Sequence, residues 1–159
     1  MAAVLKPILV ATDGSKAAEH AVRYAATLAK RRGTELVILH VVSLKKVSHW
    51  GFIDSHFTKE LRIAAEKVLD AAEAVAKEYD VTCRRMVREA ESFPHRAIAD
   101  VLAELKDVWV LVVGDKGEDL EARHALGSTT NGVLHELSKR QLPVPVLVVP
   151  SVADVELTI

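Results

Sequence analysis

The sequence predicts a three-layer α/β fold in which five parallel strands form a doubly wound sheet of order 3-2-1-4-5. Short apolar runs alternate with longer stretches of helical period along most of the chain, which is typical of βαβ units. The apolar runs show little polar alternation, so helices are expected to cover both faces of the sheet. Of the 159 residues, 50% are hydrophobic. This length fits one domain, expected over residues 1–150, followed by a C-terminal tail at 151–159.

The strands are expected, in chain order, at residues 7–11, 35–42, 81–88, 108–113 and 146–149. The third run carries the most charge, which predicts a position at the edge of the sheet. The fourth run is apolar throughout, as in a central strand, and Trp109 within it is expected to be a packing residue. Pro143 and Pro145 precede the last run and turn the chain into an extended conformation.

Helices are expected in the four gaps between the strands. Ser15 is a suitable N-cap for the first helix, whose small apolar residues recur at helical spacing until Gly33 ends it. The second follows a polar connection at 43–56, and its apolar face consists of Leu61, Ala64, Ala65, Val68, Leu69, Ala72, Val75 and Ala76. Pro94 fits the first turn of a third helix that runs to about Leu105. The fourth is expected at about 128–140.

The residues after the fourth strand form a glycine pattern suited to phosphate. The pattern is Gly114-Asp-Lys-Gly117, nine further residues, and then Gly127-Ser128-Thr129-Thr130 at the start of the fourth helix. Glycines let the backbone approach a ligand closely, and the N–H groups at a helix start attract anions. The sequence contains neither a Walker loop nor the Gly-x-Gly-x-x-Gly dinucleotide fingerprint. A plainer interpretation makes Ser128 the cap of the fourth helix.

Asp13 follows the first strand in the segment Thr12-Asp13-Gly14-Ser15. In the predicted strand order the first and fourth strands flank the point where the order reverses, and such sheets bind ligands beyond the carboxyl ends of those strands. A carboxylate at this position could accept hydrogen bonds from ribose hydroxyls or hold a metal-bound water. Asp-Gly is also a common turn sequence, so a purely local turn is the alternative role for Asp13.

Together with the glycine pattern, Ile8–Ser15, His40-Val41-Val42 and Pro145–Val149 resemble the ATP-binding branch of the universal stress protein family. The resemblance implies an adenine nucleotide alpha hydrolase-like, Rossmann-like fold and an ATP-binding regulatory module of the stress response. It implies a nucleotide site made of Ala11, Thr12, Asp13, Val41, Val113, Gly114, Lys116, Gly117, Gly127, Ser128, Thr129 and Thr130. In this site Asp13 lies beside the nucleoside, where it can also meet the Mg²⁺ of Mg-ATP, and Val41 meets the adenine through its backbone. The resemblance further implies a homodimer that pairs the last strands, at Val146, Leu147, Val148 and Val149.

One departure from the family pattern leaves alternatives open. The residues between Gly114 and Gly127 carry a net charge of −2, whereas many relatives have arginine or neutral residues there. Such a loop would repel a triphosphate unless its carboxylates face solvent or Mg²⁺ bridges them. The alternatives are a dimeric interaction protein with a degenerate site and a binder of AMP or cyclic AMP. A flavodoxin-like carrier is disfavoured, because only Asp-Gly-Ser follows the first strand where a phosphate loop would be needed.

Composition and motifs disfavour several other functions. A net charge of −1 gives no field for nucleic acid or an anionic membrane, and the single Cys83 excludes an internal disulfide. No stretch is apolar enough to span a bilayer and no signal peptide is evident, so a cytoplasmic protein with a protein partner of unknown identity is expected. No nucleophile elbow or Walker aspartate appears, so at most slow ATP hydrolysis is expected. His40 is expected to be a satisfied, partly buried side chain, and His124 lies close enough to the glycines to contact phosphate.

Overall fold

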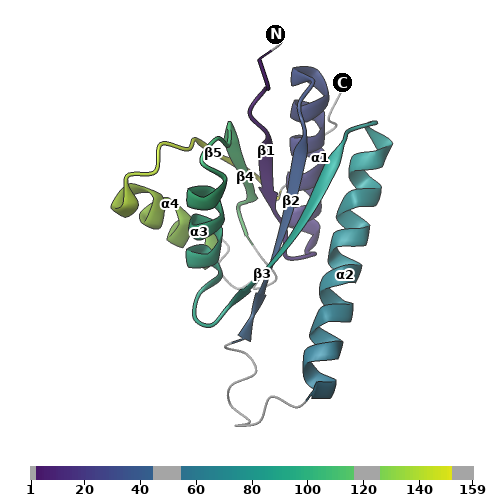
Figure 1. Ribbon diagram of the computed structural model, residues 1–159, viewed down its shortest axis with the longest axis vertical. Helices are drawn as coiled ribbons and strands as arrows, with labels where there is room; N and C mark the ends of the chain where they lie inside the picture. Colours follow the sequence, from purple (N-terminus) through teal and green to yellow (C-terminus); the bar gives the residue numbers. More distant parts are fainter. Residues whose placement is uncertain (1–2, 45–54, 117–125, 152–159) are drawn as a thin grey trace.

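The computed structural model describes residues 3–44, 55–116 and 126–151. In chain order the elements are β1 (Ile8–Ala11), α1 (Lys16–Arg32), β2 (Leu36–Ser43), α2 (Ser55–Glu78), β3 (Cys83–Ala90), α3 (Pro94–Leu105), β4 (Val110–Gly114), α4 (Ser128–Arg140) and β5 (Val146–Val149). All strand pairings are parallel, in the order β3-β2-β1-β4-β5. Helices α1 and α2 cover one face of the sheet, and α3 and α4 cover the other (Figure 1). The predicted three-layer fold and strand order are confirmed.

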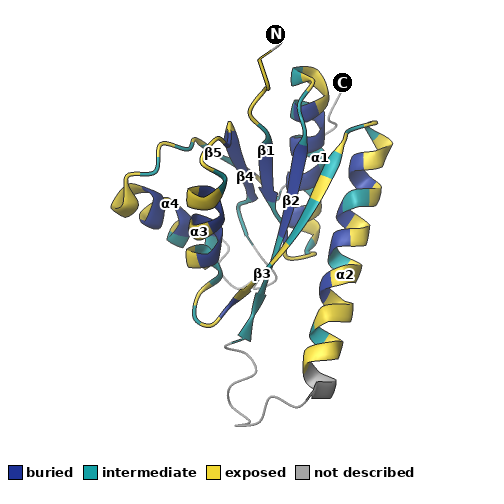
Figure 2. Ribbon diagram, in the orientation of Figure 1, coloured by how far each residue is buried: buried dark blue, intermediate teal, exposed yellow. Residues whose placement is uncertain are grey.

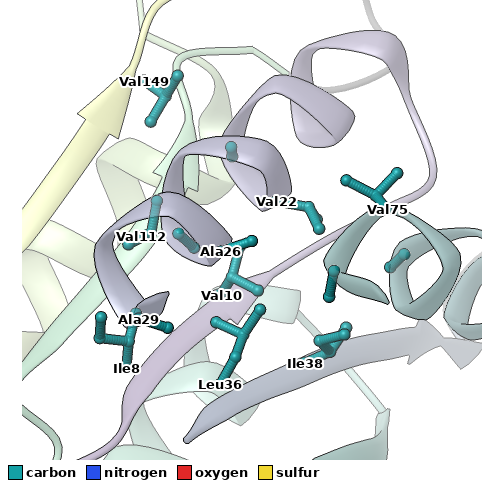
Figure 3. Close-up of a cluster of buried hydrophobic side chains, with 14 of the residues drawn as sticks. Ile8, Val10, Val22, Ala26, Ala29, Leu36, Ile38, Val75, Val112 and Val149 are labelled. Atoms are coloured by element: carbon teal, nitrogen blue, oxygen red, sulfur yellow. The ribbon is translucent and has the colours of Figure 1, made fainter. Parts of the chain in front are cut away.

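The sheet separates two hydrophobic cores. Successive strand residues point to opposite faces, so Ile8 and Val10 pack in the core under α1 and α2 (Figure 3), whereas Leu9 packs in the core under α3 and α4. All three side chains are 0% exposed. Burying a side chain of this size contributes about 1.5–3 kcal/mol. Both faces of the central strands must therefore be apolar, which explains their continuous hydrophobic runs.

Helix α1 packs closely on the sheet because its inner face is made of alanine. Ala21, Ala25 and Ala26 are 0% exposed. At its start, the Ser15 hydroxyl oxygen accepts from the Ala18 N–H at 3.1 Å, and at its end Gly33 adopts a left-handed conformation (φ 69°). The predicted cap and stop of this helix are confirmed, and they fix the two ends of α1.

Strand β3 lies at the edge of the sheet, as its charges predicted. Arg85 on this strand reaches the outer helix α2, where its guanidinium donates to Asp70 at 2.7 Å and Glu73 at 3.1 Å. It also pairs with Glu66, one turn earlier on the same helix. The outer surface of α2 is largely exposed (Figure 2). The network therefore holds a long, partly solvated helix over the edge strand, although each such exposed pair contributes only about 0–1 kcal/mol.

The prediction for Trp109 is wrong. Strand β4 begins at Val110, and the Trp109 side chain is 38% exposed. Its N–H donates to the Pro7 carbonyl at 2.9 Å, so the backbone is fixed, but the indole lies at the amino edge of the sheet, beyond the last turn of α1. No helix covers that position fully; the Arg32 guanidinium lies 4.2 Å from the centre of the ring instead.

The described part of the chain ends at Ser151, two residues after β5. The rest of the predicted tail and most of the polar connection at 43–56 lie outside the described residues. Within residues 3–44, 55–116 and 126–151, none of the helices combines the length and the apolar character needed to cross a bilayer.

Candidate functional site

The carboxyl ends of β1 and β4 lie side by side at the point where the strand order reverses. Val10 of β1 is in register with Val112 of β4. From these ends the chain enters α1 on one face of the sheet and leads to α4 on the other (Figure 1). In doubly wound sheets, ligands bind in the crevice that such a divergence creates. Both chemically specialised ends that the sequence identified, at Asp13 and Gly114, are therefore brought together.

After β1 the chain makes a tight turn that is held from several sides. The Asp13 carboxylate accepts from the Ser15 N–H at 2.9 Å, and the Thr12 hydroxyl accepts from the Gly14 N–H at 3.2 Å. Gly14 has φ +82°, and a Cβ added to it would lie 3.0 Å from a methyl group of Val68 on α2. The turn role considered for Asp13 is confirmed. Because the residue is exposed, the carboxylate remains accessible to a ligand as well.

Strand β2 supports this turn from the neighbouring position in the sheet. His40 Nδ1 lies 2.8 Å from the Thr12 carbonyl oxygen. A carbonyl can only accept, so the Nδ1 atom must carry the proton in this hydrogen bond. The half-buried, satisfied state predicted for His40 is confirmed. Val41, the next residue, is half-buried and packs on the α3–α4 core at the carboxyl end of β2, while Ala11 is in register with Leu39 of the same strand.

Hydrogen bonds from α4 and β5 fix the two ends of the glycine segment. The Thr130 hydroxyl donates to the Gly114 carbonyl at 2.7 Å, and the Gly127 N–H donates to the Asp115 carbonyl at 2.7 Å. The Asp115 N–H donates in turn to the Val149 carbonyl at 3.0 Å. Since Thr130 is only 5% exposed, its hydroxyl ties α4 to β4, which is a role that the sequence did not indicate.

Gly114 is required by the close approach of two elements. A Cβ at this position would lie 3.3 Å from the backbone carbonyl carbon and oxygen of Ala17 in the first turn of α1. Backbone cannot give way as a flexible side chain can. Glycine therefore lets the end of β4, with the buried Val113 before it, lie directly against the start of α1.

The start of α4 presents backbone N–H groups that no described side chain caps. The N-cap residue is Gly127, which has no side chain to offer, and Ser128 is the first residue of the helix. The alternative that Ser128 caps α4 is therefore wrong. The first N–H groups of a helix have no partner within it, and together with the helix dipole they attract anions. At α1, by contrast, Ser15 fills this role, so α4 offers the open anion site of the two.

Ionised groups lie behind α4, in its contact with α3. The buried Glu136 carboxylate accepts from Arg140 at 2.9 Å, and this hydrogen bond lowers the pKa of Glu136. The His95 ring of α3 packs against Gly132, and its burial lowers the pKa of His95 below the usual value of 6.5. The sequence gave no sign of this contact, because only the packed helices bring the two residues together.

Some predicted residues cannot be placed, and one unexpected residue is found. Gly117 lies outside the described residues, as does His124, whereas Lys116 and Thr129 are half-buried at the two sides of the gap. The unexpected residue is Asp115, which the sequence presents only as part of the loop charge. Its Oδ1 atom is buried and has no hydrogen-bond partner among the described residues. In the part of the chain that the structure describes, no three His, Cys, Asp or Glu side chains gather as a metal site would require.

Comparisons with known proteins agree with this geometry. The model of the universal stress protein family matches residues 5–150. A putative universal stress protein of Staphylococcus haemolyticus is 31% identical over 144 residues, which cover 91% of this chain and 84% of that protein. The solved structure of the universal stress protein UspA from Lactobacillus plantarum is 25% identical and has a TM-score of 0.69, covering 93% of this chain and 99% of that one.

Two further structures share the fold and contain nucleotides. A universal stress protein in complex with cAMP has a TM-score of 0.64 at 22% identity, over 94% of this chain and 100% of its own. The universal stress protein of Archaeoglobus fulgidus in complex with dAMP has a TM-score of 0.66 at 21% identity, over 92% of this chain and 99% of its own. The matched segment spans all five strands and both ends of the crevice, and on this evidence the chain belongs to the universal stress protein family.

Proposed function

We propose that this protein is an adenine-nucleotide-binding regulatory module whose ligand is ATP. The observation that carries the proposal is the uncapped start of α4, which opens onto the crevice beside the Asp13 turn. Structural neighbours in the family hold cAMP and dAMP, both of which combine adenine with a phosphate. The start of α4 suits the phosphate of such a ligand, and the Asp13 carboxylate at the adjacent strand end suits its nucleoside.

Under this proposal each part of the crevice has its own role. The phosphates accept from the first N–H groups of α4 and from the Ser128 hydroxyl, which is exposed. Asp13 accepts from the ribose hydroxyls, and the adenine meets the backbone at Val41, near the carboxyl end of β2. Ala11, Thr12 and Val113 form the floor at the ends of β1 and β4. Lys116, Gly117 and Thr129 complete the phosphate side.

The proposed role is regulatory, because the described residues at the crevice do not form the arrangement of an efficient hydrolase. Asp13 already accepts a hydrogen bond from the backbone of its own turn. His40 is held by Thr12 through one ring nitrogen. Neither residue combines with a nucleophile in a catalytic arrangement. Binding would therefore change which surface the protein presents to a partner, with at most slow hydrolysis of the bound ATP.

Replacing Ser128 by proline tests the proposal at a single N–H group. Proline is well tolerated at the first position of a helix, and Gly127, with φ −58° and ψ 153°, already has the conformation preferred before proline. Ser128→Pro removes the N–H and the hydroxyl, whereas the matched control Ser128→Ala removes only the hydroxyl. Calorimetric titration with Mg-ATP measures both variants, and circular dichroism verifies that the helix content is retained.

The two variants should differ clearly. We expect Ser128→Pro to weaken ATP binding by about tenfold, since a hydrogen bond to a charged group contributes about 1.5–3 kcal/mol. Ser128→Ala should lose about threefold or less, because its backbone donor remains. Equal affinity in wild type and Ser128→Pro would place the phosphates elsewhere. No heat with millimolar Mg-ATP, and no nucleotide released from freshly purified wild type on mass spectrometry, would refute the proposal altogether.

The acidic segment between the glycines favours a second candidate, a dimeric interaction protein whose site no longer binds nucleotide. Its net charge of −2 lies between the two halves of the phosphate pattern. If this candidate is right, the wild type binds no ATP, and the double variant Glu118→Lys, Asp119→Lys acquires measurable affinity. Tight binding by the wild type that the double variant leaves unchanged would contradict it.

A further inference from the structure

We infer that Asp115 makes the site selective for nucleoside di- and triphosphates that carry a divalent cation, and unfavourable for cyclic AMP. The inference rests on the proposed function and adds the ligand class to it. It starts from one atom, the buried Oδ1 of Asp115, which has no hydrogen-bond partner among residues 3–44, 55–116 and 126–151. Buried carboxylate oxygens are normally paired, so an unpaired one calls for an explanation.

The backbone prevents Asp115 from moving away from the crevice. Its N–H donates to Val149 at the end of β5, and its carbonyl accepts from Gly127 at the start of α4. Gly114, the preceding residue, is held by the Thr130 hydroxyl. Because α4 and β5 hold the preceding residue and both peptide groups of Asp115, the residue stays next to the start of α4.

The carboxylate and the start of α4 have opposite requirements. The uncapped helix start favours an anion, whereas a bare phosphate beside the Asp115 carboxylate meets charge repulsion that is strong at short range. A single phosphodiester therefore approaches the Asp115 carboxylate with no cation of its own.

A phosphate chain that chelates a divalent cation meets both requirements. Mg²⁺ is bound in proteins through one or two carboxylates together with phosphate oxygens and water. Such a cation offers the positive charge that the Asp115 oxygen lacks, while the phosphate oxygens face the N–H groups of α4. Di- and triphosphates chelate Mg²⁺ through adjacent phosphates, and the cyclic phosphodiester of cyclic AMP has only one phosphate with which to do so.

The described residues do not provide a cation site by themselves. No three potential ligands among residues 3–44, 55–116 and 126–151 lie close enough to form one. The cation should therefore bind only with the nucleotide, and the nucleotide should bind well only with the cation. A surface that is only acidic would bind the cation without the nucleotide. Binding of each only in the presence of the other therefore identifies a role of Asp115 in ligand selection.

The experiment compares the wild type with Asp115→Asn, which keeps the shape and removes the charge. The matched control is Asp80→Asn, because the Asp80 side chain is 96% exposed, lies far from the crevice and has φ 55°, a conformation that asparagine adopts readily. Calorimetry measures the affinities for ADP, ATP and cyclic AMP in excess Mg²⁺ and in EDTA. Electron paramagnetic resonance of Mn²⁺, with and without ADP, reports the cation directly.

The expected result is a dependence on Mg²⁺ that Asp115 creates. For the wild type and Asp80→Asn we expect Mg²⁺ to tighten ADP and ATP binding at least tenfold, with cyclic AMP bound weakly in both conditions. For Asp115→Asn the effect of Mg²⁺ should fall below about threefold, cyclic AMP should bind at least fivefold more tightly, and the Mn²⁺ bound with ADP should be lost.

Other outcomes overturn one or both claims. Nucleotide binding in the wild type that EDTA does not weaken, or an equal Mg²⁺ effect in Asp115→Asn, refutes the role of Asp115 and leaves the proposed function standing. No binding of any nucleotide by any variant, with or without metal, refutes the proposed function and this inference with it. A ligand-free Asp115→Asn that melts well below the wild type would show that the carboxylate has a structural partner, and this also refutes the inference.

Discussion

A single missing side chain determines how the third and fourth helices meet. Gly132 lies on the second turn of α4, and the His95 ring occupies the space in which a side chain would stand. A Cβ at this position would lie 2.5 Å from His95 Cγ, well inside van der Waals contact. Glycine is a poor helix residue, so its presence here is explained by the fit of the ring and by nothing else in α4.

Gly132→Ala should therefore destabilise the protein even though alanine is the better helix former. Overpacking of this kind costs about 1–3 kcal/mol, and we expect a loss in that range in the free energy of unfolding, measured by urea titration. In a His95→Ala background the sign should reverse, with Gly132→Ala stabilising by about 0.8–1 kcal/mol through helix propensity alone. A destabilisation of equal size in both backgrounds would show that the ring is not the cause.

Helices α3 and α4 form a contact with more ionisable groups than their apolar faces suggest. His95 is partly withdrawn from solvent beside Glu136, Arg96, His135 and Arg140, and its lowered pKa arises first from burial. The folded state thus favours the neutral ring, whereas the unfolded chain titrates near 6.5. Below pH 6.5 the unfolded state binds more protons, and stability falls.

The stability of the wild type should accordingly decrease as the pH is lowered from 7 towards the pKa of folded His95. The lowered pKa of Glu136 has its effect only further down, below the usual carboxyl value of 4.5, so the two groups act in separate windows. We expect His95→Gln to flatten the dependence of stability on pH between pH 7 and 5.5. A wild-type stability that is constant over this range would contradict the assignment.

Element positions could be predicted from the sequence because each has a local cause. Ser15 and Gly33 fix the ends of α1 through a cap and a left-handed turn, and the apolar run of β4 can be buried only at the centre of a sheet. Contacts between elements cannot be predicted in this way, because no short stretch of sequence determines them. The pairing of Thr130 with Gly114, the fit of His95 to Gly132 and the buried oxygen of Asp115 arise only after distant segments have packed.

The candidate site shows the same difference between features with a local cause and contacts between distant elements. Asp13 and Gly114 could be identified because strand ends and glycines can be recognised in the sequence itself. The strand order then places the two residues together. Thr130 was expected in the nucleotide site, yet its hydroxyl is buried in a hydrogen bond between two elements. A threonine just after a glycine can bind phosphate or tie two elements together, and its place in the sequence is the same in both cases. The sequence therefore could not distinguish the two roles.

At the scale of the whole molecule, the two edges of the sheet differ in how well they are protected. The β3 edge carries charged residues and the ion pairs of Arg85, whereas Val146, Leu147 and Val148 on the β5 edge are apolar and half-buried. An apolar edge strand with unpaired backbone groups is a surface for strand pairing. This supports the homodimer that the family resemblance implies.

Val148→Pro tests this dimer without disturbing the sheet. The carbonyls of Pro145 and Val149 accept from β4, so the alternation of a strand points the Val148 N–H away from β4 and towards a partner. Proline there removes an outward donor only. We expect the wild type to sediment as a dimer, Val148→Pro as a folded monomer, and the control Val148→Thr as a dimer. A wild type that is monomeric at every concentration, or a dimer that survives in Val148→Pro, would exclude the β5 interface.

Three hydrogen bonds hold Gly114, Asp115 and Gly127 in place. They also affect how the sequence of such a site can change among relatives. They join the two ends of the glycine segment to each other and to the last strand, so the fold does not rely on the identity of the residues strung between them. Substitutions and insertions in a segment with anchored ends cost little stability. Evolution can therefore exchange its charges freely, and relatives with one scaffold can acquire different nucleotide preferences while the crevice stays intact.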